Sequence, residues 1–236
     1  METTWKYLMG SLASLLVLSC GGGGDSVKLD DLGTEMAGAT CHKMFECCTQ
    51  EEITAMSSGG FLPKFSDEAG CKSAFGGFFT GFMVTAMRES EKKGRISYDE
   101  DKAGDCITAF KASKCGGAFM DTESVQGCDQ FIQPKVANGS ACSQDFECTS
   151  GFCEGGSQEK EGKCAARVGK DKACTSNDQC EEGLYCEMAT ESPTCKSPKA
   201  DNEKCSGDDE CQSDNCEGSD SGEGTCKPEA ATCDGK

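Results

Sequence analysis

The sequence predicts a two-part exported protein: an all-α, disulfide-stapled helical module, followed by small disulfide-rich repeats with little regular structure and short β-hairpins. Cysteine supplies 21 of the 236 residues, which is the composition of a disulfide scaffold in an oxidising compartment. Only 36% of the residues are apolar, so we do not expect one large hydrophobic core. The net charge of -18 argues against a nucleic-acid-binding protein, because such proteins need a basic surface.

The N-terminus has the features of an export signal. Residues 1–19 carry Lys6 ahead of an apolar run that is shorter than the roughly 20 residues needed to span a bilayer. The run ends Leu-Val-Leu-Ser before Cys20, which resembles the bacterial lipobox and implies that residues 1–19 are removed and Cys20 is lipidated. By resemblance to bacterial sorting rules, Gly21 implies the outer membrane. The alternative is an ordinary signal peptide with a chance cysteine at its end. Residues 20–32 are predicted to form the anchor and a flexible glycine-rich linker.

Residues 137–236 contain three tandem cysteine-rich repeats and a tail. The first cysteines of the three sets of four are separated by 32 and 31 residues, and five residues always lie between the first and second cysteine of a set. Three copies make a chance pattern implausible. Each unit has few large apolar side chains, so disulfides, worth roughly 2 to 4 kcal/mol each, must hold it together. The repeats are placed at about 139–165, 170–196 and 201–227.

These units resemble the Dickkopf N-terminal cysteine-rich domain, in the form found as tandem repeats in predicted surface lipoproteins of myxobacterial type. The resemblance covers residues 139–227 and rests on cysteine spacing, glycines and acidic turns, as in CSQDFECTSGFC and CSGDDECQSDNC. It implies an extracellular disulfide module, and no residue here transfers the signalling activity of the animal proteins. The segment GRISYDEDKAGDC, ahead of the repeats, is similar to one in the same lipoproteins.

Residues 33–136 are predicted to form a small helical bundle with cysteines on its buried faces. Apolar and cysteine side chains recur at helical spacing in three segments, and Ser66 and Asp99 are expected to cap the second and third of these. Gly94 is the expected C-cap of the second. A short fourth helix is predicted from Val125 to Ile132. The three stripes are Cys41, Met44, Phe45 and Cys48; Cys71, Phe75, Phe78, Phe79, Phe82, Met83 and Ala86; and Ala103, Cys106, Ile107 and Phe110.

Setting Cys20 aside leaves twenty cysteines, an even number that permits ten disulfides. The helical module holds seven of them, so Cys233 in the tail either pairs with that module and links the two ends of the chain, or stays free for an intermolecular bond. The sequence favours neither. The predicted disulfide cysteines are Cys41, Cys47, Cys48, Cys71, Cys106, Cys115, Cys128, Cys142, Cys148, Cys153, Cys164, Cys174, Cys180, Cys186, Cys195, Cys205, Cys211, Cys216, Cys226 and Cys233.

Few residues suggest catalysis or metal binding. His42 is the only histidine, and with Cys41, Cys47 and Cys48 it could form a zinc or nucleophile site, but in an exported protein these cysteines are expected to be disulfides. No C-x-x-C motif occurs, which removes the usual basis for a thiol oxidoreductase. An EF-hand match from Asp99 fails at two ligand positions. Acidic stretches in the repeats are read as solvated surface. We therefore expect no enzymatic activity, no metal and no cofactor.

The favoured function is a non-enzymatic cell-envelope lipoprotein whose repeats serve as a surface binding or structural module. Its expected partners are the membrane, through lipid on Cys20, and an extracellular or envelope protein, with no nucleic acid. Residues 137–236 hold 22 acidic and 10 basic side chains, against 18 and 12 in residues 21–136, so the repeats carry most of the negative charge and favour cationic partners. The alternative function is a secreted disulfide-rich protease inhibitor or ligand-like antagonist.

Overall fold

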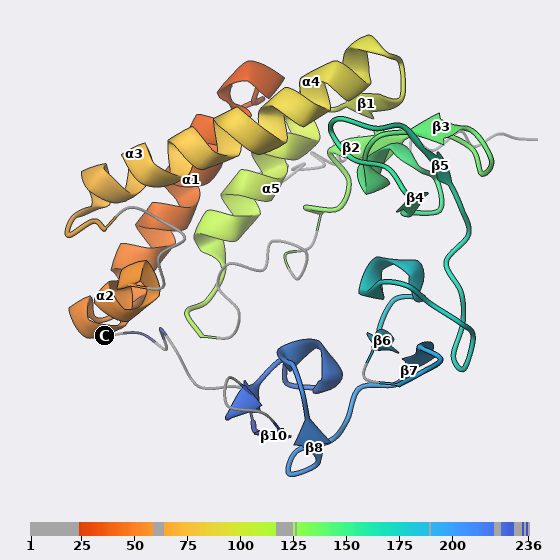
Figure 1. Ribbon diagram of the computed structural model, residues 1–236. Coiled ribbons are helices and arrows are strands. Elements are labelled where there is room, and N and C mark those ends of the chain that lie inside the picture. The colour runs from red at the N-terminus through yellow and green to blue at the C-terminus, as the bar shows by residue number, and fades with distance from the viewer. Residues whose placement is uncertain are drawn as a thin grey trace, which may run out of the picture.

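The computed structural model describes residues 24–58, 64–116, 125, 127–188, 190–219, 223–228, 233 and 235. The chain forms a helical body, residues 24–136, and an arm of three cysteine-rich repeats, residues 137–228 (Figure 1). In Figure 1 the arm curves away from one end of the body and the C-terminus lies at the other end, beside α2 (Gln50–Ser58). The predicted signal peptide and Cys20 lie outside the described residues.

The body is built mainly from helices, as predicted. The first begins at Leu29, four residues ahead of the predicted start of the module at residue 33. Helices α3 (Glu68–Phe78) and α4 (Thr85–Lys92) and the π-helix between them form one continuous rod. The rod packs across α1 (Leu29–Cys47) and lies over α5 (Glu100–Ala112) in Figure 1. The helices are α1 (Leu29–Cys47), α2 (Gln50–Ser58), α3 (Glu68–Phe78), a π-helix (Phe79–Val84), α4 (Thr85–Lys92) and α5 (Glu100–Ala112).

The π-helical turn corrects the predicted buried face of the rod. A π-turn inserts one extra residue, and here the Thr85 hydroxyl donates to the Thr80 carbonyl oxygen five residues back. The side chains that face the body therefore recur every four residues, at Cys71, Phe75, Phe79, Met83 and Met87. Phe78 and Phe82, which were expected on the same face, are 40% and 57% exposed.

The helix ends follow local chemistry, with one correction. Asp67, not Ser66, caps α3, because its carboxylate accepts from the Gly70 amide at 2.7 Å. Asp99 caps α5 as predicted, accepting from the Lys102 amide at 3.1 Å. Gly94 follows α4 with a φ of 70°, the left-handed conformation expected of a glycine after a helix.

The prediction of a fourth helix over residues 125–132 is wrong, and with it the purely all-α module. Gly127 has a φ of 92°, which turns the chain, and the following residues form the strand β2 (Ile132–Pro134). It pairs antiparallel with β1 (Ile96–Tyr98), which the sequence analysis did not anticipate. The Tyr98 and Phe131 rings meet edge to face, and the Cys106–Cys128 disulfide ties this region to α5.

Two apolar clusters form the core of the body. One lies between α1, the rod and α5 and includes Leu32, Val84, Ile107 and Phe110, all at most 3% exposed. The second surrounds the C-terminal half of α1 and contains the Cys41–Cys71 disulfide. The body is thus held by apolar packing as well as by disulfides.

The described residues of the arm form short strands, as predicted, together with 3-10 turns that the sequence did not predict. Each repeat contains an antiparallel hairpin, and in the first and third a further strand pairs along it. The first repeat has β3 (Ala141–Cys142), β4 (Cys153–Glu154) and β5 (Gly162–Cys164). The second has β6 (Tyr185–Glu187) and β7 (Thr194–Lys196), and the third has β8 (Lys204–Cys205), β9 (Cys216–Glu217) and β10 (Gly224–Cys226). A 3-10 turn precedes the second cysteine of each repeat, at Asp145–Glu147, Asn177–Gln179 and Asp208–Glu210.

Candidate functional site: the repeat arm and its junctions

The three repeats share one disulfide pattern, in which the first cysteine pairs with the third and the second with the fourth. The two bonds of each repeat lie together in a small buried cluster. Cysteine sulfur atoms also lie near one another in groups of three, but every one of these atoms is in a disulfide. The pairs are Cys142–Cys153, Cys148–Cys164, Cys174–Cys186, Cys180–Cys195, Cys205–Cys216 and Cys211–Cys226.

An acceptor three residues before the second cysteine holds the third cysteine in place. Asp145 accepts from the Cys153 amide at 2.6 Å, and Asn177 and Asp208 make the same bond in their repeats at 2.8 and 2.7 Å. Burial raises the pKa of Asp145 above its usual value. The sequence predicts only a polar, acidic turn between the first two cysteines of each repeat. The recurrence of these acceptors at one position in all three repeats was the signal that could have found them.

A second acceptor stands directly before the second cysteine. Glu147, Gln179 and Glu210 each accept from the backbone amide four residues earlier, at 2.6, 2.8 and 3.1 Å. The position needs an acceptor and not a charge, because the neutral Gln179 serves in the second repeat. Besides accepting from this amide, Glu210 in the third repeat forms an ion pair with Lys199 at 2.5 Å. The charge at this position is therefore free to serve contacts outside the repeat.

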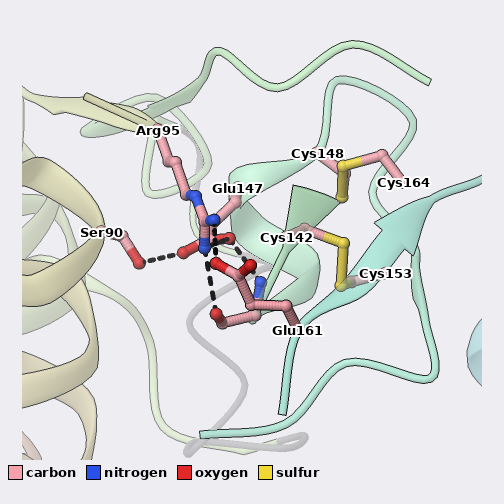
Figure 2. Close-up of polar contacts among 9 residues, drawn as sticks. Ser90, Arg95, Cys142, Glu147, Cys148, Cys153, Glu161 and Cys164 are labelled. Carbon is pink, nitrogen blue, oxygen red and sulfur yellow. Dashed lines mark hydrogen bonds and ion pairs between the residues drawn. A yellow bond between two sulfur atoms is a disulfide. The ribbon is translucent and has the colours of Figure 1, made fainter. Parts of the chain in front are cut away.

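In the first repeat that charge joins the arm to the body (Figure 2). Glu147 is fully buried, and it accepts from the Ser90 hydroxyl of α4 at 2.5 Å and lies 3.4 Å from the Arg95 guanidinium. Arg95 also donates to the Ser143 hydroxyl at 3.0 Å and pairs with Glu161, and this contact lowers the pKa of the Glu161 carboxyl. One arginine of the body thus binds two carboxylates of the first repeat.

Backbone and apolar contacts complete this junction. The Val136 amide donates to the Glu147 carbonyl oxygen, and the Thr149 amide donates to the Val136 carbonyl oxygen, both at 2.9 Å. The Phe146 side chain packs against the core cluster of the body. The first repeat is therefore docked on the body and does not hang from a linker.

The tail closes the arm back onto the body. Cys233 forms a disulfide with Cys48, which decides between the two readings of the sequence in favour of the covalent link between the chain's ends. Its amide donates to Glu52 at 2.9 Å, and this bond, with one from the Thr49 amide, lowers the pKa of Glu52. Neighbouring Cys47 bonds instead to Cys115. We call the Cys48–Cys233 bond the clasp.

The second and third repeats touch each other between these two attachments. The side-chain amide of Asn177 donates to an Asp209 carboxylate oxygen at 2.5 Å. A groove of about 740 Å³ runs between the two repeats. Tyr185 and Met188 line it, and Met188 is 58% exposed. The exposed groups of this part of the arm are therefore mainly loop residues and carboxylates on a rigid disulfide frame.

The imagined metal or thiol site at the end of α1 has no free thiol. Cys41, Cys47 and Cys48 each form a disulfide with a different distant cysteine, and His42 lies exposed beside them. Asp99, Asp101 and Asp105 cap or belong to α5, so they do not form a calcium-binding loop. All twenty cysteines after Cys20 are paired, as the sequence predicted.

Comparison with known proteins gives no family for the chain: no protein-family model, no curated protein and no solved structure matches it. Ten disulfides in one chain suggest an extracellular or exported protein. Within the described ranges, none of the helices is both long and apolar enough to cross a membrane.

Proposed function

We propose that this protein is a non-enzymatic lipoprotein of the bacterial cell envelope, anchored through Cys20, whose repeat arm is a rigid module for contacts with an envelope or extracellular protein. The observation that carries the proposal is the attachment of the arm to the body at both ends, through Arg95 and Glu147 at one end and the clasp at the other. Such an arm loses little conformational entropy on binding. The Dickkopf-like ancestry and the outer-membrane location belong to the same proposal.

The chemistry of the arm favours a cationic partner. Its excess of acidic side chains is spread over loops that the disulfides hold in fixed positions, and many of these side chains are exposed. Opposite charge on a partner would speed association and select against acidic surfaces. The buried carboxylate of Glu147 instead serves the junction with the body.

The first test is the intact mass of the protein extracted from its native membrane and alkylated without reduction, with a reduced sample measured beside it. We expect a diacyl or triacyl increment on Cys20 and no alkylated thiol, followed by twenty alkylated cysteines after reduction. An unmodified, soluble protein with all disulfides formed would overturn the anchor and favour the secreted inhibitor or antagonist. Free thiols between residues 41 and 48 would contradict the scaffold itself.

The second test concerns the arm. The protein is immobilised and the binding of envelope extract is measured for the parent and for a Cys48→Ser, Cys233→Ser double variant, which opens the clasp. If the fixed arm is the binding module, the double variant should bind its partner several-fold more weakly while the first repeat stays docked. Equal binding by the two proteins would show that the closed arm is not needed.

A further inference from the structure

Residues 24–28, predicted as part of a flexible linker, are fastened to the body. The Val27 amide donates to the Glu100 carbonyl oxygen at 2.9 Å, and the Val27 carbonyl oxygen accepts from the Tyr98 hydroxyl at 2.8 Å. The Gly24 amide donates to the Asp105 carboxylate at 2.8 Å. The Val27 side chain is 9% exposed and belongs to the main core cluster. We call residues 24–28 the strap.

Two glycines allow the strap to lie against α5. A Cβ atom on Gly104 would overlap the carbonyl oxygen of Asp25, and a Cβ on Gly24 would overlap the Gly104 carbonyl and the Thr108 hydroxyl. Neither glycine has a positive φ, so the requirement is space and not backbone conformation. A glycine within a helix costs about 1 kcal/mol relative to alanine, and here the close approach of the strap accounts for it.

The docked strap leaves a short tether. Four peptide units separate Cys20 from Gly24, and at about 3.3 to 3.6 Å per residue they span at most about 14 Å. Helix α5, with 13 residues, is about 20 Å long. The distance from Gly24 to a lipid on Cys20 is therefore shorter than helix α5. A tether that was free as far as Leu29 would be about twice as long.

From this geometry we infer that the exposed face of α5 beside the strap, at Asp101, Asp105 and Thr108, is the surface of the body that lies against the membrane. This inference rests on the proposed anchor at Cys20, whereas the docking of the strap on α5 does not depend on that anchor. The partner of this surface is the headgroup region of the bilayer. The glycine pair Gly24 and Gly104 thus sets the orientation of the protein as well as its distance from the membrane.

The docking of the strap is tested first, in a soluble full chain with Cys20→Ser. We expect the Val27 amide to exchange its hydrogen slowly, and Gly104→Ala to speed this exchange at least tenfold by displacing the strap. The matched control is Gly38→Ala in α1, where a Cβ would meet nothing within 4 Å. The control should leave Val27 protected. Random-coil exchange at Val27 in the parent, or equal exchange in the parent and Gly104→Ala, would overturn the docking.

The orientation is tested with the lipidated protein in phosphatidylcholine vesicles that carry an acceptor dye at the headgroups. A donor is introduced as an unnatural amino acid either at residue 101 on α5 or at residue 51 on α2. Energy transfer should be clearly stronger from residue 101, and Gly104→Ala should reduce this difference. Equal transfer from the two positions would refute the membrane-facing surface.

The two tests also separate this inference from the proposed function. If mass spectrometry finds no lipid on Cys20, the membrane-facing surface falls together with the anchor, while slow exchange at Val27 still establishes the strap. If Cys20 is lipidated and residues 101 and 51 transfer energy equally, the anchor stands and the inferred orientation is wrong.

Discussion

The body and the arm are both crossed by disulfides, but they differ in what else holds them. The body has two apolar clusters with side chains such as Leu32 and Phe110 from several helices, in addition to its disulfides. The second and third repeats have clusters made almost entirely of cystine sulfur. Apolar burial needs many residues around one centre, and a unit of about 30 residues cannot supply them. A rigid arm with little core is possible because its covalent links replace the core.

The strongest test of this difference removes part of the body's core. Phe110→Ala should lower the free energy of unfolding of the body by about 3 to 5 kcal/mol, because Phe110 is 2% exposed in the main cluster. The repeats should keep their amide protection. Thermal unfolding followed by circular dichroism at 222 nm, together with hydrogen exchange, measures both. The control is Phe82→Ala on the rod formed by α3, the π-helix and α4, because Phe82 is 57% exposed and its loss should cost far less. A loss of protection in all three repeats would contradict the separation of the two regions.

Removing one disulfide from each region sharpens the comparison. The cysteines of Cys180–Cys195 and Cys106–Cys128 have sequence separations of 15 and 22, so on a chain-entropy model each disulfide contributes about 3 kcal/mol. Replacing both cysteines of a pair by alanine should unfold the second repeat in the first case, because little else holds it. In the second case the body should stay folded with a lower melting temperature.

Hydrogen exchange resolved by residue distinguishes these outcomes. The Val168 amide donates to the Gln179 carbonyl oxygen at 2.8 Å, and the Glu181 amide donates to the Val168 carbonyl oxygen at 2.9 Å. Both amides should lose protection only in the variant that lacks Cys180 and Cys195. A second repeat that remained protected without this disulfide would show that the arm has a stabilising element other than its covalent links.

The junction offers a smaller perturbation. Glu147→Gln keeps an acceptor for the Ser143 amide, as Gln179 does in the second repeat, but removes the charge that faces Arg95. We expect the free energy of docking the first repeat on the body to weaken by about 1.5 to 3 kcal/mol, the range for a hydrogen bond to a charged group. Faster exchange at the Val136 and Thr149 amides would report it. The exposed Glu154→Gln serves as control, and equal effects of the two changes would contradict the junction.

The smallest effect is expected at the clasp and depends on pH. Hydrogen bonds from the Cys233 and Thr49 amides lower the pKa of Glu52 in the folded protein. The stability that ionised Glu52 adds to the folded tail is therefore complete above the pKa of the unfolded chain, about 4.3. This stability is lost as the pH falls through the lower pKa of the folded protein. Exchange at the Cys233 amide, corrected for the intrinsic rate, should rise across that window. Glu52→Gln should remove this pH dependence, and an unchanged profile would show that Glu52 does not hold the tail.

The repeats were the part of the protein that the sequence predicted best. The presence of two disulfides in each and the scarcity of regular structure follow from cysteine spacing and from the low apolar content of each unit. The helices of the body were also predictable from their stripes of apolar residues. These features depend on neighbours within about 15 residues, which the sequence displays directly.

Predictions failed where a local pattern was compatible with more than one structure. Residues 125–132 carry apolar side chains at helical spacing, but pairing with Ile96–Tyr98 made their end a strand. Phe78 and Phe82 fit the apolar stripe of an ideal helix, but both are exposed, and Phe82 lies within the π-helical segment. The glycine-rich segment that ends at Gly24 predicts a flexible linker, although Gly24 fits against Gly104, 80 residues away.

By itself the sequence determined that the chain is disulfide-bonded, that its cysteines after Cys20 can all pair, and that its C-terminal part is a repeat. Only the tertiary structure decided that Cys48 bonds to Cys233, that Arg95 binds Glu147 and that the strap lies on α5. The reason is that the entropy of closing a loop changes slowly with its length. Sequence separation therefore does not identify a distant partner, and the packed surfaces of the folded body do.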